Sequence, residues 1–170
     1  MNAKKLTEIA LLATIALIIF VVELRIPNPI PIPGVKLGLA NIITVYAVYH
    51  YRAREVLPLV LTRIVLGAIF GGNLMALMYS LAGGLLCLTG MLLLRKAISE
   101  KYIWICSILG AVLHNIGQIS VAIVITGTPA IIAYLPFLLV SGCIAGAFTG
   151  MCAQFVIKRS KAHNFPGNQL

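Results

Sequence analysis

No Asp, Glu, Lys or Arg occurs between Lys101 and Lys158, and the segment from residue 74 to residue 94 also lacks them. A helix needs about 20 consecutive, mostly apolar residues to cross a hydrocarbon core of ~30 Å, so these segments are long enough to span a bilayer. Of the 170 residues, 61% are hydrophobic and 10% are charged, which leaves too little polar surface for a water-facing globule. The sequence therefore predicts an all-α integral membrane protein.

Six apolar segments are candidates for transmembrane helices. They cover residues 6–22, 37–51, 56–70, 74–94, 102–125 and 130–157. The second and third are short, since 15 residues give a helix of only about 22 Å, and they must use flanking residues or thin the bilayer. Merging neighbours into a four-helix protein would place Arg52, Arg54 and Glu55 in lipid, at a higher cost. We expect a single membrane domain with six spans.

The cations predict how this domain is oriented. In the six-span arrangement one side holds ten of the 13, namely Lys4, Lys5, Arg52, Arg54, Arg95, Lys96, Lys101, Lys158, Arg159 and Lys161. The other side holds only Arg25 and Lys36, and Arg63 lies within the third span. The positive-inside rule then predicts that both termini are cytoplasmic in a bacterial-type plasma membrane. The basic tail, residues 158–170, is expected to lie against anionic lipid or to be disordered.

The composition also argues against several functions. The chain has four acidic residues and no Asp, and its four cysteines lie in apolar runs without the spacing of a metal site. It contains no phosphate-binding loop of the GxxxxGK[ST] type. Because most cations are explained by topology, their excess does not indicate a nucleic-acid partner. We expect no catalytic residues, no metal and no cofactor.

Arg63 and Lys36 are the cations most suggestive of a ligand. An unpaired Arg deep in a span costs about 2.5–3.5 kcal/mol on insertion scales. Arg63 could meet carbonyls and water, reach Glu23, bind an anionic ligand or a partner's acid, or snorkel to an interface. Lys36 precedes a helix N-terminus, where the helix dipole disfavours a cation unless an anion lies nearby.

Uncharged polar side chains also occur within or beside the spans. His114 and Gln118 are four residues apart on one helix face, and Asn115 lies beside them. Asn41 and Asn73 are weaker cases near the ends of other spans. Such side chains either line a cavity or form hydrogen bonds between helices, and the sequence leaves both possibilities open.

Small residues recur at four-residue spacing on two helices. Gly142, Gly146 and Gly150 form such a stripe on the last span, and Ala10 and Thr14 form a shorter one on the first. Stripes of this kind let helices approach closely, either within the bundle or against a partner protein.

Three motifs together carry a resemblance to a known family. They are PIPIPGVKLGLANI, GAIFGGNLMALMYSLAGG and LHNIGQ. In a six-span chain of this length they resemble the Gx transporter family, whose members are often labelled heptaprenyl diphosphate synthase component I. That family is similar to the substrate-binding (S) components of energy-coupling-factor transporters, six-helix proteins that bind a vitamin-like molecule from outside. By position, the resemblance implicates Lys36, Asn41, Asn73, His114, Asn115 and Gln118 in substrate binding.

The resemblance implies a substrate-binding or transport subunit for a small, anionic organic molecule, with a separate membrane coupling subunit and ATPase. The S components dock through an Ala-xxx-Ala pattern, whereas this first span has Ala10, Ala13 and Ala16 at spacing three. The alternative is a non-catalytic accessory subunit of isoprenoid or quinone synthesis, or of flavin-based extracellular electron transfer. Polyprenyl diphosphate synthesis needs carboxylate clusters that hold magnesium, which a chain without Asp does not supply.

Overall fold

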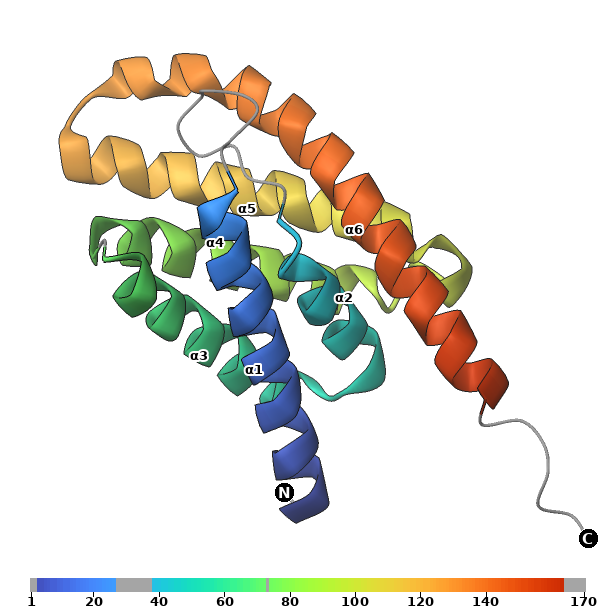
Figure 1. Ribbon diagram of the computed structural model, residues 1–170. Helices are drawn as coiled ribbons and strands as arrows, with labels where there is room; N and C mark the ends of the chain where they lie inside the picture. The colour runs from blue at the N-terminus through green and yellow to red at the C-terminus, as the bar shows by residue number, and fades with distance from the viewer. Residues whose placement is uncertain (1–2, 27–37, 73, 164–170) are drawn as a thin grey trace, which may run out of the picture.

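A computed structural model describes residues 3–26, 38–72 and 74–163, and every regular element in these ranges is a helix (Figure 1). This confirms the expected all-α class for the described residues. In chain order the elements are α1 (Ala3–Arg25), α2 (Asn41–His50), α3 (Ala53–Gly71), α4 (Leu74–Leu94), the 3-10 helix η1 (Glu100–Tyr102), α5 (Ile103–Thr126), the 3-10 helix η2 (Pro129–Tyr134) and α6 (Leu135–His163).

Four helical segments are long and apolar enough to cross a membrane: α1, α4, α5 with η1, and α6 with η2. The 10 residues of α2 are too few to span a bilayer on their own. In α3, with 19 residues, any window of 18 contains Arg54, Glu55 and Arg63, so charge rather than length separates it from the four. Of the six predicted spans, four are therefore long and apolar enough to cross a membrane, whereas α2 is shorter and α3 carries more charge.

The last helix extends beyond the span expected for it. α6 continues through Lys158 and ends at His163, six residues into the segment predicted to be a basic tail. The residues from Lys158 to His163 contain no Pro or Gly, and Lys, Arg and Ala are good helix formers.

Contacts between helix ends gather the cationic segments at one end of the molecule. Lys5 Nζ lies 3.3 Å from Glu55 Oε1, which joins the start of α1 to the start of α3. Arg95, just after α4, donates a hydrogen bond of 2.9 Å to the backbone oxygen of Tyr51, and Lys161 pairs with Glu100. In Figure 1 these helix ends lie toward the bottom and the right, and the opposite ends of α3 and α5 and the start of α6 lie toward the left and the top.

Helices α4, α5 and α6 pack closely, with α5 in contact with both neighbours (Figure 1). The glycine stripe of α6 lies against α5, and a Cβ placed on Gly150 would come within 2.5 Å of Trp104 Cα. A Cβ placed on Gly146 would lie 2.9 Å from Ile108 Cα. These backbones are therefore closer than any larger residue would permit.

Large apolar side chains cover the outside of the bundle. Val124 is 82% exposed, Phe155 69% and Ile144 68%. Large apolar patches are rarely exposed on soluble monomers, but lipid solvates them without cost. Together with the four apolar helices, this surface identifies a membrane-embedded protein.

Candidate functional site

A central cavity of about 290 Å³ lies between the helices, and all six of them contribute to its wall. Its polar lining residues are Glu23, Asn41, Thr44, Arg63, Ser80, Ser107, His114, Asn115, Gln118 and Thr149. On α1 and α3 the lining residues lie in the half of the helix away from the cationic end, as Glu23 and Gly71 show. The cavity therefore brings together five of the seven residues that the sequence suggested for substrate binding.

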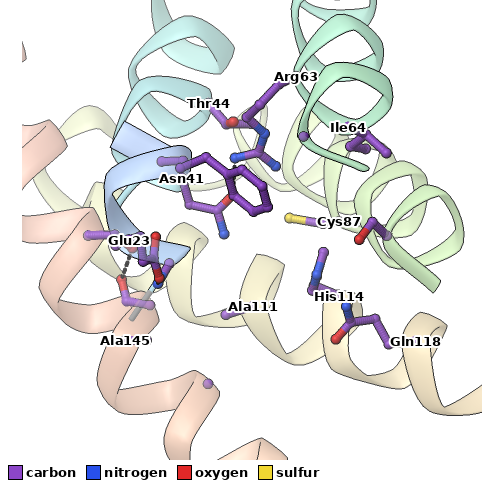
Figure 2. A pocket seen from close by; sticks show the side chains of 18 of the residues that line it. Glu23, Asn41, Thr44, Arg63, Ile64, Cys87, Ala111, His114, Gln118 and Ala145 are labelled. Atoms are coloured by element: carbon purple, nitrogen blue, oxygen red, sulfur yellow. Dashed lines mark hydrogen bonds between the residues drawn. The ribbon is translucent and has the colours of Figure 1, made fainter. Parts of the chain in front are cut away.

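Arg63 is the positively charged residue among those that line the cavity. Its side chain is half-buried, and Nη1 donates a hydrogen bond of 3.0 Å to Asn41 Oδ1, from α3 to the first residue of α2. Figure 2 shows the two side chains pointing toward each other. The two ion pairs among the described residues join Lys5 to Glu55 and Lys161 to Glu100. The recorded hydrogen-bond partner of Arg63 is thus a neutral amide.

Glu23, a possible partner of Arg63 in the sequence, has a different role in the structure. Its Oε1 accepts a hydrogen bond of 2.6 Å from the backbone N–H of Gly38, and Oε2 accepts one of 3.1 Å from that of Leu39. These N–H groups lie just before α2, where the helix dipole and unpaired donors favour a carboxylate. The charge of Glu23 is therefore stabilised by backbone donors, and α1 is tied to the start of α2.

Thr44 is a cavity residue that the sequence reasoning missed. It is only 4% exposed, and its Oγ1 has no hydrogen-bond partner within the described part of the chain. Thr44 follows Asn41 by three residues, so both lie on the same face of α2. The three-residue spacing from Asn41 was therefore a signal that the sequence contained. A buried hydroxyl without a partner is costly unless a ligand or water satisfies it.

The polar group on α5 divides into two roles. His114 and Gln118 line the cavity across from Arg63 and Asn41 (Figure 2). Asn115 also borders it, but is buried, and its Nδ2 donates a hydrogen bond to the backbone oxygen of Leu138 in α6. Asn115 therefore forms a hydrogen bond between helices, whereas His114 and Gln118 face the cavity.

The remaining candidates lie apart from this group or beyond what the structure describes. Lys36 and Asn73 fall outside the described residues, as does the Pro-rich segment before Lys36. On α1, Ala10 and Thr14 are exposed, whereas Ala13 and Ala16 face the core. The first pair therefore lies on the outer surface of the bundle. Gly142 and Gly146 both line the cavity and pack against α5.

The cavity's chemistry suits binding by polar contacts. Among residues 3–26, 38–72 and 74–163, no group of three His, Cys, Asp or Glu side chains is placed to hold a metal ion. The wall combines one cation, one carboxylate, one imidazole and several amide and hydroxyl groups with apolar side chains such as Ile64 and Met91. Ligand pockets commonly have this composition: a mainly apolar wall with a few polar groups that orient the ligand.

Comparisons with known proteins identify the family but no individual relative. Neither a search of curated proteins nor a search of solved structures returned a match. A protein-family model described as heptaprenyl diphosphate synthase component I matches residues 12–156, from the middle of α1 almost to the end of α6. The description names one component of a synthase, which implies that a further component exists. Since the match covers most of the chain, the protein belongs to the heptaprenyl diphosphate synthase component I family.

Proposed function

We propose that this protein is a membrane binding subunit that takes a small anionic organic molecule, vitamin-like or a biosynthetic precursor, into its central cavity from the outer face. Arg63 supplies the positive charge that attracts the ligand, and Asn41, Thr44, His114 and Gln118 orient its polar groups. A separate module powers any transport, because the sequence has no phosphate-binding loop.

The observation that carries this proposal is that Arg63, a cation among membrane helices, has a neutral amide as its hydrogen-bond partner. A guanidinium in a membrane bundle is costly, by about 2.5–3.5 kcal/mol at a span centre, unless it is compensated. Here its recorded partner is the amide of Asn41, while Glu23 is engaged by two backbone N–H groups. Glu23 attracts Arg63 electrostatically, but the ion pairs among the described residues do not include these two. An anion in the cavity would supply a direct, charge-assisted hydrogen bond.

The proposed orientation follows from the same separation of charges. The cationic ends of the helices form the cytoplasmic side, with both termini, and all six helices lie within the membrane. The cavity residues of α1 and α3 then lie toward the outer face. The exposed pair Ala10 and Thr14 is a candidate contact for a membrane coupling subunit, and Lys36 and Asn73 are candidate ligand contacts near the outer surface.

The second candidate is a non-catalytic accessory subunit of isoprenoid or quinone synthesis, favoured by the family's description. In that case the magnesium-binding carboxylates come from a partner, because this chain contains no Asp. A related possibility is a membrane partner in flavin-based extracellular electron transfer.

A ligand screen on the purified protein separates these candidates. Flavins, thiamine, prenyl diphosphates and quinone precursors are tested for a rise in the unfolding temperature, and the same preparation is checked for a partner that co-purifies stoichiometrically. A binding subunit is stabilised by at least one small anion. If no compound stabilises the protein while a synthase component co-purifies, the accessory role replaces the binding role.

A further inference from the structure

We infer that the cavity selects a small monocarboxylate with an apolar body and rejects phosphate esters, diphosphates and prenyl chains. This inference rests on the proposed function, that the cavity binds an anion, and it names the class of that anion. It is carried by the charge balance, the donor arrangement and the size of the cavity.

The charge balance disfavours ligands with more than one negative charge. The charged residues that line the cavity are one cation, Arg63, and one carboxylate, Glu23. Glu23 is already satisfied by the backbone N–H groups of Gly38 and Leu39. Arg63 and Glu23 have opposite formal charges, so a bound monoanion leaves the site with one net negative charge. A dianion or a diphosphate would leave two or more net negative charges, at a higher electrostatic cost in a low-dielectric site.

The donors around Arg63 suit the two oxygens of a carboxylate. A guanidinium carries five N–H groups in a planar fork that matches a carboxylate in a bidentate arrangement. Its Nη1 contacts Asn41 Oδ1 at 3.0 Å, which fixes the position of the fork. Thr44, buried and without a partner in the described residues, lines the same cavity and offers one hydroxyl donor. Phosphate sites usually add further cations or a run of backbone N–H groups.

The size and the walls of the cavity limit the rest of the ligand. A cavity of about 290 Å³ lies near the lower end of the range for pockets that hold drug-sized ligands, so it suits a small organic molecule. A heptaprenyl chain, with its seven five-carbon units, is too large to fit whole within this volume. Apolar side chains such as Ile64, Ala111 and Ala145 line the remaining wall and suit a short aliphatic or aromatic body.

Matched probes test the inference. Hexanoate, benzoate and nicotinate are compared with the neutral benzamide and nicotinamide, with the dianion phenyl phosphate, and with isopentenyl diphosphate. Binding to the detergent-purified full chain is measured by thermal shift and titration calorimetry. We expect at least one carboxylate to bind, with its amide and phenyl phosphate at least tenfold weaker.

Two variants show whether a response comes from the cavity. Arg63→Gln removes the cation of the cavity, and Arg25→Gln removes an exposed cation at the end of α1. Carboxylate binding should weaken at least tenfold in Arg63→Gln and stay unchanged in Arg25→Gln. If phenyl phosphate or the diphosphate binds more tightly than every carboxylate, in an Arg63-dependent manner, the inference is overturned and the proposed function stands. If no anion binds, both are wrong.

Discussion

The contact between α5 and α6 at Gly150 gives a sharp prediction about the packing of the bundle. A Cβ at this position would lie 2.5 Å from Trp104 Cα and 2.7 Å from Ser107 Cβ. An ordinary contact begins near 3.4 Å, so in Gly150→Ala the helices must separate locally by almost 1 Å. Backbone atoms cannot rotate away as a side chain can.

Overpacking of this kind costs about 1–3 kcal/mol. For a chain of this size 1 kcal/mol lowers the unfolding temperature by roughly 2–4 °C, so a cost near 2 kcal/mol predicts a fall of about 4–8 °C. The assay is thermal unfolding of the purified protein in one detergent, followed by circular dichroism or by the fluorescence of Trp104. The single tryptophan lies at the altered contact, so its emission should also change.

Gly71→Ala is the matched control. Gly71 is also helical, and a Cβ there would meet Leu24 Cδ1 at 3.7 Å, an ordinary van der Waals contact. The control should unfold within about 1 °C of the native protein, because it adds a methyl group without a clash. If Gly150→Ala unfolds at the same temperature as Gly71→Ala, the close approach of α5 and α6 is wrong.

Two further predictions concern the cationic end of the molecule. The carboxyl of Glu55 accepts the backbone N–H of Arg52 at 2.9 Å and lies near Lys5 and Arg54, so its pKa is lowered from the ordinary value of 4.5. The ionised carboxylate stabilises the fold fully above the pKa of the unfolded chain, and this effect is lost as the pH falls through the lower pKa of the folded state. The native protein should therefore unfold at a higher temperature than Glu55→Gln near neutral pH, and the difference should vanish in acid. A difference that persists or grows in acid would refute this prediction. Arg95 donates hydrogen bonds to the carbonyl oxygens of Val48 and Tyr51 at the end of α2. Arg95→Gln should therefore lower the free energy of unfolding by about 1.5 kcal/mol, measured by denaturant unfolding. An unchanged denaturant midpoint would show that these contacts do not stabilise the protein.

The helical class and the two longest central elements could be predicted from apolar run length alone. The limits of α4 agree with the predicted segment 74–94, and those of α5 differ from 102–125 by one residue at each end. Hydropathy could not predict how short α2 is, because the residues before Asn41 are also apolar. The start of α2 is instead associated with a three-dimensional contact, the hydrogen bonds from Gly38 and Leu39 to Glu23.

The candidate site shows the same division between local and long-range information. An Arg within an apolar span is visible in the sequence, and so is the spacing of His114 and Gln118 on one face. Arg63 forms its hydrogen bond with Asn41 rather than with Glu23 because of how α1, α2 and α3 pack. Spacing along the chain does not encode that packing. Likewise, the sequence left open whether Asn115 links helices, and its bond to Leu138 is a contact between residues 23 positions apart.

The affinity of an anion for Arg63→Gln tests the proposed binding function most directly. Once the ligand screen has identified a small anion that binds, its dissociation constant is measured by calorimetry for the native protein, Arg63→Gln and Arg25→Gln. We expect Arg63→Gln to bind at least tenfold more weakly, the loss of one charge-assisted contact, with unchanged membrane insertion and unfolding temperature. Equal affinity in all three proteins would contradict the proposal and make Arg63 a structural residue.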